Sequence, residues 1–298
     1  MKKKRNLMTP LLILMLFAGL SLLLYPTFAD YWNSFTQTRA IAAYSEQVQQ
    51  MNDEGYTQMW ADAEAYNAGI STRSNLFVLS DEEKAAYNAL LDVLGIGIMG
   101  YVEIPTIDVS LPLYHGTDSA VLQTGIGHLE WSSLPVGGAG THCVLSGHRG
   151  LPSARLFTDL DQLVEGDLFY LRVLDQVLTY EIDQILIVEP TDTDELKIVE
   201  GQDYCTLVTC TPYGINSHRL LVRGTRILDG KPASGKLILS NEIEEVSLVY
   251  IVPVALTFFV VVMLCAIGIG SLTGKKTQRK HKKVYRKEKG REKEQNDL

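Results

Sequence analysis

The chain has 298 residues, enough for one ordinary domain with attachments or for two small domains. Its 46% hydrophobic and 21% charged residues exclude global disorder, and its four cysteines are too few for a disulfide-stapled scaffold. The net charge of −8 argues against nucleic acid as a partner. That charge is unevenly distributed, because basic ends at residues 2–5 and 275–293 flank an acidic middle at residues 30–245.

Each basic end borders an uncharged, apolar run. Residues 1–29 fit a cleaved signal peptide and an uncleaved transmembrane anchor equally well. Residues 246–274 exceed the ~20 apolar residues that a helix needs to cross a bilayer, so they predict a transmembrane helix. Because basic flanks stay in the cytoplasm, we expect both termini there and residues 30–245 outside the cell. The basic tail, residues 275–298, is expected to contact anionic membrane lipid.

Helical patterns come next in the chain. Apolar and small residues recur every three or four positions across residues 30–71, with a break at residues 52–55. Another helix is predicted from Asp81, because acidic residues crowd its first turn. We therefore expect residues 30–98 to form an extracellular helical stalk and collar.

From residue 99 the hydrophobic period changes to that of strands. Short β-branched and aromatic runs are separated by Gly, Pro, Asn and Asp. They occupy residues 101–114, 141–148, 167–190, 204–210 and 219–227. Five to eight strands with few helical interruptions indicate a small β-barrel or sandwich. We place this domain at residues 99–229 and a linker at residues 230–245.

Cys210 is the cysteine best placed for chemistry, because it ends a predicted strand and precedes a turn that contains Pro and Gly. His148 also closes a predicted strand, and Arg219 begins the strand after the cysteine. A cysteine nucleophile needs an imidazole to exchange its proton and a cation to stabilise the oxyanion. These residues supply all three groups if their strands are neighbours. The alternative is a small buried cysteine with solvated basic side chains.

The segment TLVTC, with Arg219 nine residues after Cys210, resembles the signature of sortases, specifically of the pilin-polymerising class C. Further motifs resemble the same class in the same order across residues 99–227: GYVEIPTIDVSLPLYHGT, GIGHLEWSSLPVGG, LSGHRGLPSARLFTDLDQLVEGD and VEPTDTDELKIV. The resemblance implies a mainly β fold, an eight-stranded sortase-type β-barrel with an N-terminal helical stalk and a transmembrane helix at each end. It also implies Cys210 as nucleophile, His148 as general acid and base, and Arg219 as stabiliser of oxyanion and substrate, with no cofactor and no metal.

The function implied by this resemblance is that of a membrane-anchored cysteine transpeptidase on a Gram-positive cell. Such an enzyme cleaves an LPxTG-like sorting signal between Thr and Gly through a thioester. In class C the acceptor is a pilin lysine, so the expected partners are pilins or surface proteins with such signals, and the lipid membrane. Two alternatives stay open: a sortase that attaches surface proteins to cell-wall peptide, and a non-catalytic, membrane-tethered binding ectodomain.

One family feature is missing from the sequence. Class C sortases carry an Asp-Pro-aromatic lid upstream of the barrel, whereas residues 69–91 contain no Asp-Pro. Phe77 is the candidate for the lid aromatic, with an ordinary hydrophobic contact as the alternative. Thr209, Arg149 and His128 are candidates for the substrate groove, and His128 also has a purely structural alternative.

The remaining cysteines of the barrel have matching positions. Cys143 lies five residues before His148, and Cys205 lies five before Cys210. The resemblance implies that these strands are parallel neighbours, so both cysteines are expected at similar heights, on the face opposite the catalytic side chains. A strand spacing of ~4.8 Å and an exported location permit a disulfide. Two buried free thiols are the alternative.

Overall fold

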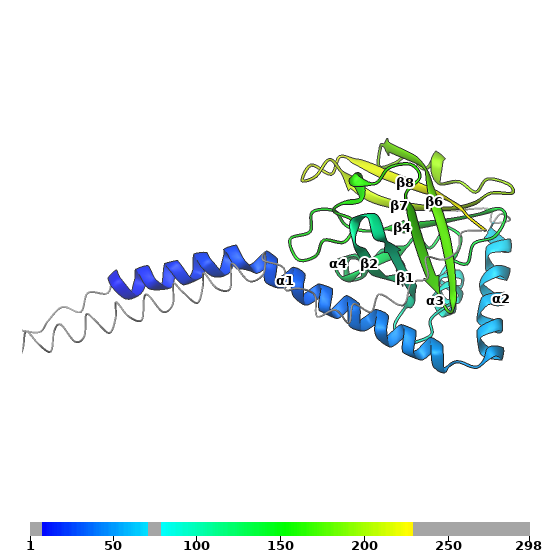
Figure 1. The fold of residues 1–298 in the computed structure, drawn as a ribbon, viewed down its shortest axis with the longest axis horizontal. Coiled ribbons are helices and arrows are strands. Elements are labelled where there is room, and N and C mark those ends of the chain that lie inside the picture. The colour runs from blue at the N-terminus through cyan, green and yellow to red at the C-terminus, as the bar shows by residue number, and fades with distance from the viewer. Residues whose placement is uncertain (1–7, 71–78, 229–298) are drawn as a thin grey trace, which may run out of the picture. The chain divides into compact units, whose positions relative to one another are not determined.

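A computed structural model describes residues 8–70 and 79–228 (Figure 1). The predicted second transmembrane helix, the basic tail and the lid candidate Phe77 lie outside the described residues. From Tyr25 onward the described chain belongs to one compact unit, while the part of the first helix before Tyr25 belongs to another.

Three helices precede the strands: α1 (Met8–Gln50), α2 (Asp53–Ile70) and α3 (Asp81–Ala89). The segment Leu11–Gln50 of α1 is the one helix among the described residues that is long and apolar enough to cross a membrane. α3 begins where the sequence predicts, because Ser80 caps it. The Ser80 hydroxyl accepts a hydrogen bond from Glu83 N, and the Glu83 carboxylate accepts one from Ser80 N.

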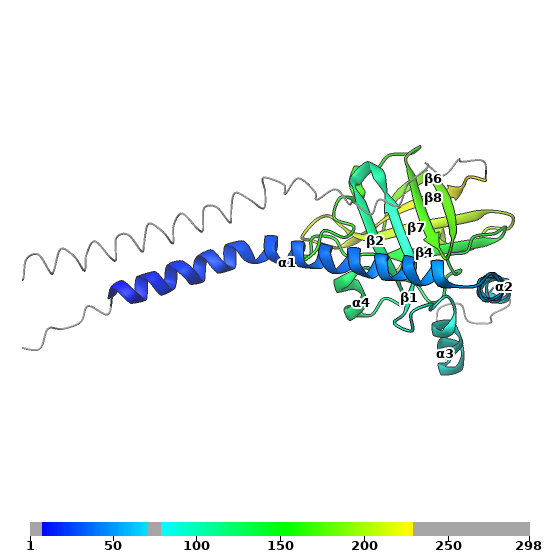
Figure 2. The same ribbon diagram turned by 60° about the horizontal axis from the view of Figure 1, so that its bottom comes forward.

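Eight strands close into a barrel in the order β1-β2-β3-β4-β7-β8-β6-β5 (Figures 1 and 2), which confirms the predicted eight-stranded fold. Their bounds are β1 Ile98–Ile104, β2 Val109–His115, β3 Ile126–His128, β4 Thr141–Ser146, β5 Leu168–Val173, β6 Gln176–Val188, β7 Asp203–Thr211 and β8 His218–Arg226. The connections contain helix α4 (Ser119–Thr124) and 3₁₀ turns η1 (Pro105–Ile107), η2 (Leu160–Gln162) and η3 (Asp194–Leu196). The sequence patterns do not predict β3 or α4, since neither is long enough to show a period.

Aromatic side chains fill the barrel and attach the stalk to it. Phe169 and Tyr180 are fully buried and stack with their ring centroids 5.4 Å apart. Tyr44 of α1 is also buried, and its hydroxyl donates to Met99 O (2.9 Å) and accepts from Leu174 N (2.7 Å). The second half of α1 therefore packs directly on β1 (Figure 2).

A buried histidine makes the barrel sensitive to acid. His142 in β4 is 1% exposed, and its Nδ1–H donates to Lys197 O (2.9 Å) while its Nε2 accepts from Thr206 Oγ1 (2.7 Å). Burial disfavours the charged ring and lowers the pKa of His142 below its usual 6.5.

We predict that the free energy of unfolding falls as the pH drops below 6.5, because the unfolded chain then binds a proton that the folded chain excludes. Urea unfolding of the full chain in detergent, at about pH 7.5 and about pH 5.5, measures this loss. The variant His142→Gln does not titrate and should lose less stability between the two pH values. Equal losses in the two proteins would contradict the prediction.

Candidate active site

Three neighbouring strands meet at the candidate site. β4 and β7 are parallel, with Cys143 opposite Cys205 and Ser146 opposite Val208. β7 pairs antiparallel with β8, and this register places Cys210 directly opposite Arg219. The thiol of Cys210 and the guanidinium of Arg219, on consecutive strands, thus meet at one end of the barrel.

Cys210 and Arg219 share the outer face of the barrel. Along β7, Leu207 packs in the interior and Val208 in a separate outer cluster, so the alternation of a strand puts Cys210 outside. Directly opposed residues have Cβ atoms about 5 Å apart, which brings the Arg219 side chain within reach of the sulfur. Arg219 Nη1 also donates to the carbonyls of Asn216 (3.3 Å) and His218 (3.1 Å). Both Cys210 and Arg219 are partly exposed.

His148 lies two residues beyond β4, not at the strand end predicted from the sequence. Gly147 N still donates to Val208 O (3.1 Å), and Thr209 Oγ1 donates to Gly147 O (2.8 Å). These two bonds keep the departing chain beside β7. Extending the parallel register by two residues places His148 alongside Cys210. His148 is partly exposed, like Cys210.

The loop that follows His148 packs back against the site. Phe157 N donates to His148 O (3.1 Å), and a Cβ on Gly147 would lie 2.6 Å from the Phe157 ring. Only glycine therefore allows this ring to pack beside the residue before His148. Gly150 has φ +72°, a left-handed conformation that favours glycine.

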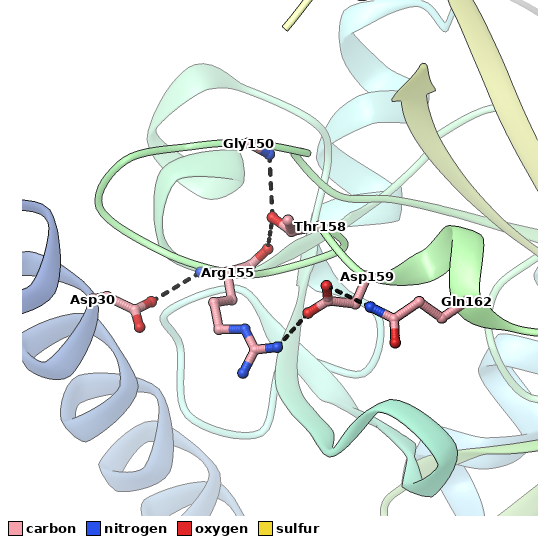
Figure 3. Close-up of polar contacts among 6 residues, drawn as sticks. All are labelled: Asp30, Gly150, Arg155, Thr158, Asp159 and Gln162. Carbon is pink, nitrogen blue, oxygen red and sulfur yellow. Dashed lines mark hydrogen bonds and ion pairs between the residues drawn. The ribbon is translucent and has the colours of Figure 1, made fainter. Parts of the chain in front are cut away.

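Helix α1 braces the far side of this loop (Figure 3). Asp30 Oδ1 accepts a hydrogen bond from Arg155 N (3.0 Å), and Asn33 Nδ2 donates to Ser153 O (2.8 Å). Inside the loop, Thr158 Oγ1 accepts from Gly150 N (3.1 Å). The loop that carries the histidine thus contacts the stalk helix.

An apolar cluster lies on the same outer face as Cys210. Its members come from β4, β6, β7, β8 and the loops that cover these strands. Buried and partly buried members are Val144, Leu196, Val208, Leu221, Leu129, Trp131, Leu186 and Val188. Val208 precedes Cys210 on its face of β7, and Val188 pairs with Arg219, so this apolar surface reaches the sulfur.

Two of the three groove candidates lie inside the protein. Thr209 is 1% exposed and its hydroxyl donates to Gly147 O, so it supports the His148 segment instead of facing a groove. His128 is fully buried, with Nδ1 bonded to the Tyr87 hydroxyl (2.9 Å) and Nε2 to Ser133 O (2.8 Å). The sequence does not show that Thr209 and His128 face inward, because the face on which a strand residue lies depends on the strand register.

The third groove candidate, Arg149, is also largely enclosed. Its side chain is 9% exposed, and it bonds Thr211 and the carboxylate of Asp161. Asp161 and Thr211 are not among the site residues predicted from the sequence, although Asp161 lies within the LPSARLFTDLDQL segment that carries the resemblance. In the described part of the chain, no group of three or more His, Cys, Asp or Glu side chains has metal-binding geometry.

Cys143 and Cys205 are register partners, which confirms their predicted height, and both are buried free thiols on the inner face. Burial raises the pKa of Cys143, but hydrogen bonds with Cys205 and His128 outweigh it and lower that pKa to about 6. Burial and the hydrogen bond with Cys143 raise the pKa of Cys205 well above its usual range. Cys205 therefore keeps its proton beside the second buried sulfur.

We predict that Cys143 and Cys205 are unlinked in the protein isolated from cell membranes, because both sulfurs are shielded from oxidants by the barrel. The protein is unfolded without reductant, alkylated, digested and analysed by mass spectrometry, with a pre-reduced sample as control. Both cysteines should carry the alkyl group in both samples. A linked peptide that disappears on reduction would contradict this prediction.

The comparisons with known proteins agree with the fold. A family model described as a sortase domain matches residues 102–227. The crystal structure of sortase C1 from Streptococcus agalactiae is 51% identical, with TM-score 0.62, and the match covers 63% of this chain and 98% of that one. Sortase C from Streptococcus pneumoniae is 48% identical, with TM-score 0.57, and the match covers 63% of this chain and 96% of that one.

Matches to curated relatives are shorter. Sortase D of Bacillus subtilis is 33% identical over 131 residues, which are 43% of this chain and 63% of that protein. Sortase A of Streptococcus agalactiae is 31% identical over 117 residues, 38% of this chain and 47% of that protein. The chain thus spans less than two thirds of each of these two relatives. The barrel, its strand order and the solved class C structures together show that the chain belongs to the sortase family.

Proposed function

We propose that the chain is a cysteine transpeptidase that acts on LPxTG-type sorting signals, with Cys210 as nucleophile, His148 as general acid and base, and Arg219 as oxyanion stabiliser. The observation that carries the proposal is the register of β7. It sets Cys210 opposite Arg219 on the outer face, and the parallel register with β4, extended two residues beyond Ser146, would bring His148 alongside.

The chemistry follows from these three groups. The Cys210 thiolate attacks the threonine carbonyl of the sorting signal, and the Arg219 guanidinium donates to the oxyanion that forms. His148 gives a proton to the glycine nitrogen as the C–N bond breaks, which leaves a thioester on the sulfur. An acceptor amine then attacks the thioester, His148 takes the amine proton, and the thiolate is regenerated. The thioester keeps the acyl group activated, so no nucleotide is consumed.

The apolar cluster beside Cys210 supports a substrate with apolar side chains before the cleaved bond. Val208 and Leu221 are buried within this cluster, and its partly exposed members Trp131, Leu186 and Val188 leave apolar surface on the face that carries the sulfur. The leucine and proline of an LPxTG-type signal match such a surface, and their burial there would hold the threonine carbonyl near the thiolate.

For the acceptor we propose a pilin lysine. The solved structures that resemble this chain support it: the one from Streptococcus pneumoniae is described with pilin substrate specificity, and one from Clostridium perfringens contains a C-terminal cell wall sorting motif. Transfer to cell-wall peptide uses the same thioester and differs only in the attacking amine. The identity of the attacking amine therefore distinguishes a pilin-polymerising sortase from one that attaches proteins to cell-wall peptide.

The proposed topology places the barrel outside the cell. The apolar part of α1 is the first membrane span, and residues 246–274 are proposed as the second from their uncharged sequence. Basic residues outside both segments would keep the two termini in the cytoplasm. In the domain plan proposed here, residues 30–98 are the stalk with its candidate lid region, and residues 99–229 are the catalytic barrel.

The thioester is the first test. The full chain in detergent, incubated with an LPxTG-type peptide, should give a covalent adduct on Cys210 by mass spectrometry. Cys210→Ala should give none, whereas Cys205→Ala, which removes a buried thiol, should still give it. His148→Ala should lower the rate about a hundredfold or more, the usual size of a general acid–base contribution.

Absence of an adduct with the unmodified chain, or equal adducts with Cys210→Ala, would instead support a binding ectodomain. Because a lid can hold a site shut, Phe77→Ala is run in parallel. An adduct that forms only with this variant supports the enzyme and identifies the lid.

The acceptor is tested by competition. A pilin with its sorting signal and a cell-wall stem peptide are offered together to the thioester-forming enzyme. We expect isopeptide-linked pilin multimers, which resist boiling in detergent, because a pilin lysine is the proposed nucleophile. Exclusive transfer to the stem peptide would contradict the pilin proposal and leave the transpeptidase proposal standing.

A further inference from the structure

A single arginine connects the two segments that carry the proposed nucleophile and base. Arg149 directly follows His148, and its Nη1 donates to Thr211 Oγ1 (3.2 Å). Thr211 directly follows Cys210. The same guanidinium pairs through Nη2 with the Asp161 carboxylate of η2. The Arg149 side chain therefore contacts the residue after Cys210 and is itself held by Asp161, which belongs to a third segment of the chain.

This contact lies where the backbone no longer holds the two segments together by regular strand pairing. β4 ends at Ser146, and the bond from Gly147 N to Val208 O precedes His148. Apart from the bond that its carbonyl accepts from Phe157 N, His148 therefore depends on contacts made by its neighbours. Arg149 suits this task because its planar guanidinium donates in two fixed directions and its side chain is only 9% exposed.

We propose that Arg149 is a positioning residue, which sets the His148 imidazole against the Cys210 sulfur through its bonds to Thr211 and Asp161. The proposal rests on the proposed function, since it concerns the same site. It replaces the expectation that Arg149 lines the substrate groove, because both terminal nitrogens of the guanidinium are bonded within the protein, to Thr211 and Asp161.

The same loop offers a matched control. Arg155 pairs with Asp159 (Figure 3), as Arg149 pairs with Asp161. The Arg155 side chain, however, is 68% exposed. Removing the Arg155 side chain changes the charge of the loop by the same amount. Its backbone bond to Asp30 persists in any substitution except proline.

Lysine separates positioning from charge. A cation near a thiol favours the thiolate, so loss of Arg149 would also act through its charge. Arg149→Lys keeps the charge and removes the planar fork. If Arg149 acts by positioning His148 and not by its charge, Arg149→Lys should lose as much activity as Arg149→Gln.

The experiment uses the full chain in detergent and two measurements. The first is kcat and KM for cleavage of an LPxTG-type peptide. The second is the rate of Cys210 alkylation by iodoacetamide across pH, followed on the Cys210 peptide by mass spectrometry. Alkylation reports how the imidazole and the thiol share a proton, and it needs no peptide substrate. The variants are Arg149→Lys, Arg149→Gln, Asp161→Asn, Thr211→Val and Arg155→Gln.

We expect Arg149→Lys and Arg149→Gln to lower kcat about ten- to a hundredfold with little change in KM, because small misplacements of catalytic groups cost that much. Both should shift the pH profile of alkylation. Asp161→Asn and Thr211→Val should act in the same direction with smaller effect, and they decide the matter if the Arg149 variants do not fold. Arg155→Gln should match the unmodified chain.

Three results would overturn the proposal. A raised KM with unchanged kcat and alkylation would make Arg149 a substrate contact. Full activity in Arg149→Lys would show that its charge alone matters. An equal loss in Arg155→Gln would show a general effect on the loop. If the proposed function itself were wrong, the unmodified chain would cleave no peptide. The alkylation profiles of the variants could still be compared.

Discussion

Strands β4 and β7 lie side by side and parallel, with Cys143 opposite Cys205, and the candidate catalytic groups take their places from that register. Because side chains alternate along a strand, the pairing that buries the two thiols also turns Cys210 outward. β8 then adds Arg219 opposite Cys210. If the strand register slipped by one residue, Cys210 would enter the core and a buried side chain would reach the surface. The register that packs the core is therefore also the register that places the site.

Beyond the end of β4, side-chain hydrogen bonds replace backbone pairing in holding the chain next to β7. Thr209 bonds Gly147 O, and Arg149 bonds Thr211 and Asp161, so the segment that holds His148 is tied to β7 on both sides of the histidine. The loop further on is bound to α1 through Asp30. The helix that carries the apolar N-terminal run therefore also contacts, at Asp30, the loop behind the proposed base. Helix α1 thus contacts this loop as well as β1.

The parts of this account that the sequence predicts share a physical basis. Strand runs and the start of α3 were predictable because hydrophobic period and capping residues are local properties. The equal spacing from Cys143 to His148 and from Cys205 to Cys210 predicts their alignment once parallel neighbours are implied by the sortase resemblance. The rest depends on tertiary contacts. Thr209 and His128 looked suitable for a groove, and only the register shows that both face inward. The bond between Arg149 and Thr211 joins residues 62 positions apart, which no local pattern reveals.

The most direct test of the account measures whether His148 and Cys210 are neighbours. The variant His148→Cys places a second thiol at the proposed base, and adjacent strands ~4.8 Å apart lie within the range that a disulfide spans. Mild oxidation of this variant, followed by digestion without reductant and mass spectrometry, should yield a disulfide between positions 148 and 210. Arg155→Cys, in the same loop, should remain unlinked to Cys210 under the same conditions. If oxidation leaves the thiols at 148 and 210 separately alkylatable, the two segments do not converge and the proposed site is wrong.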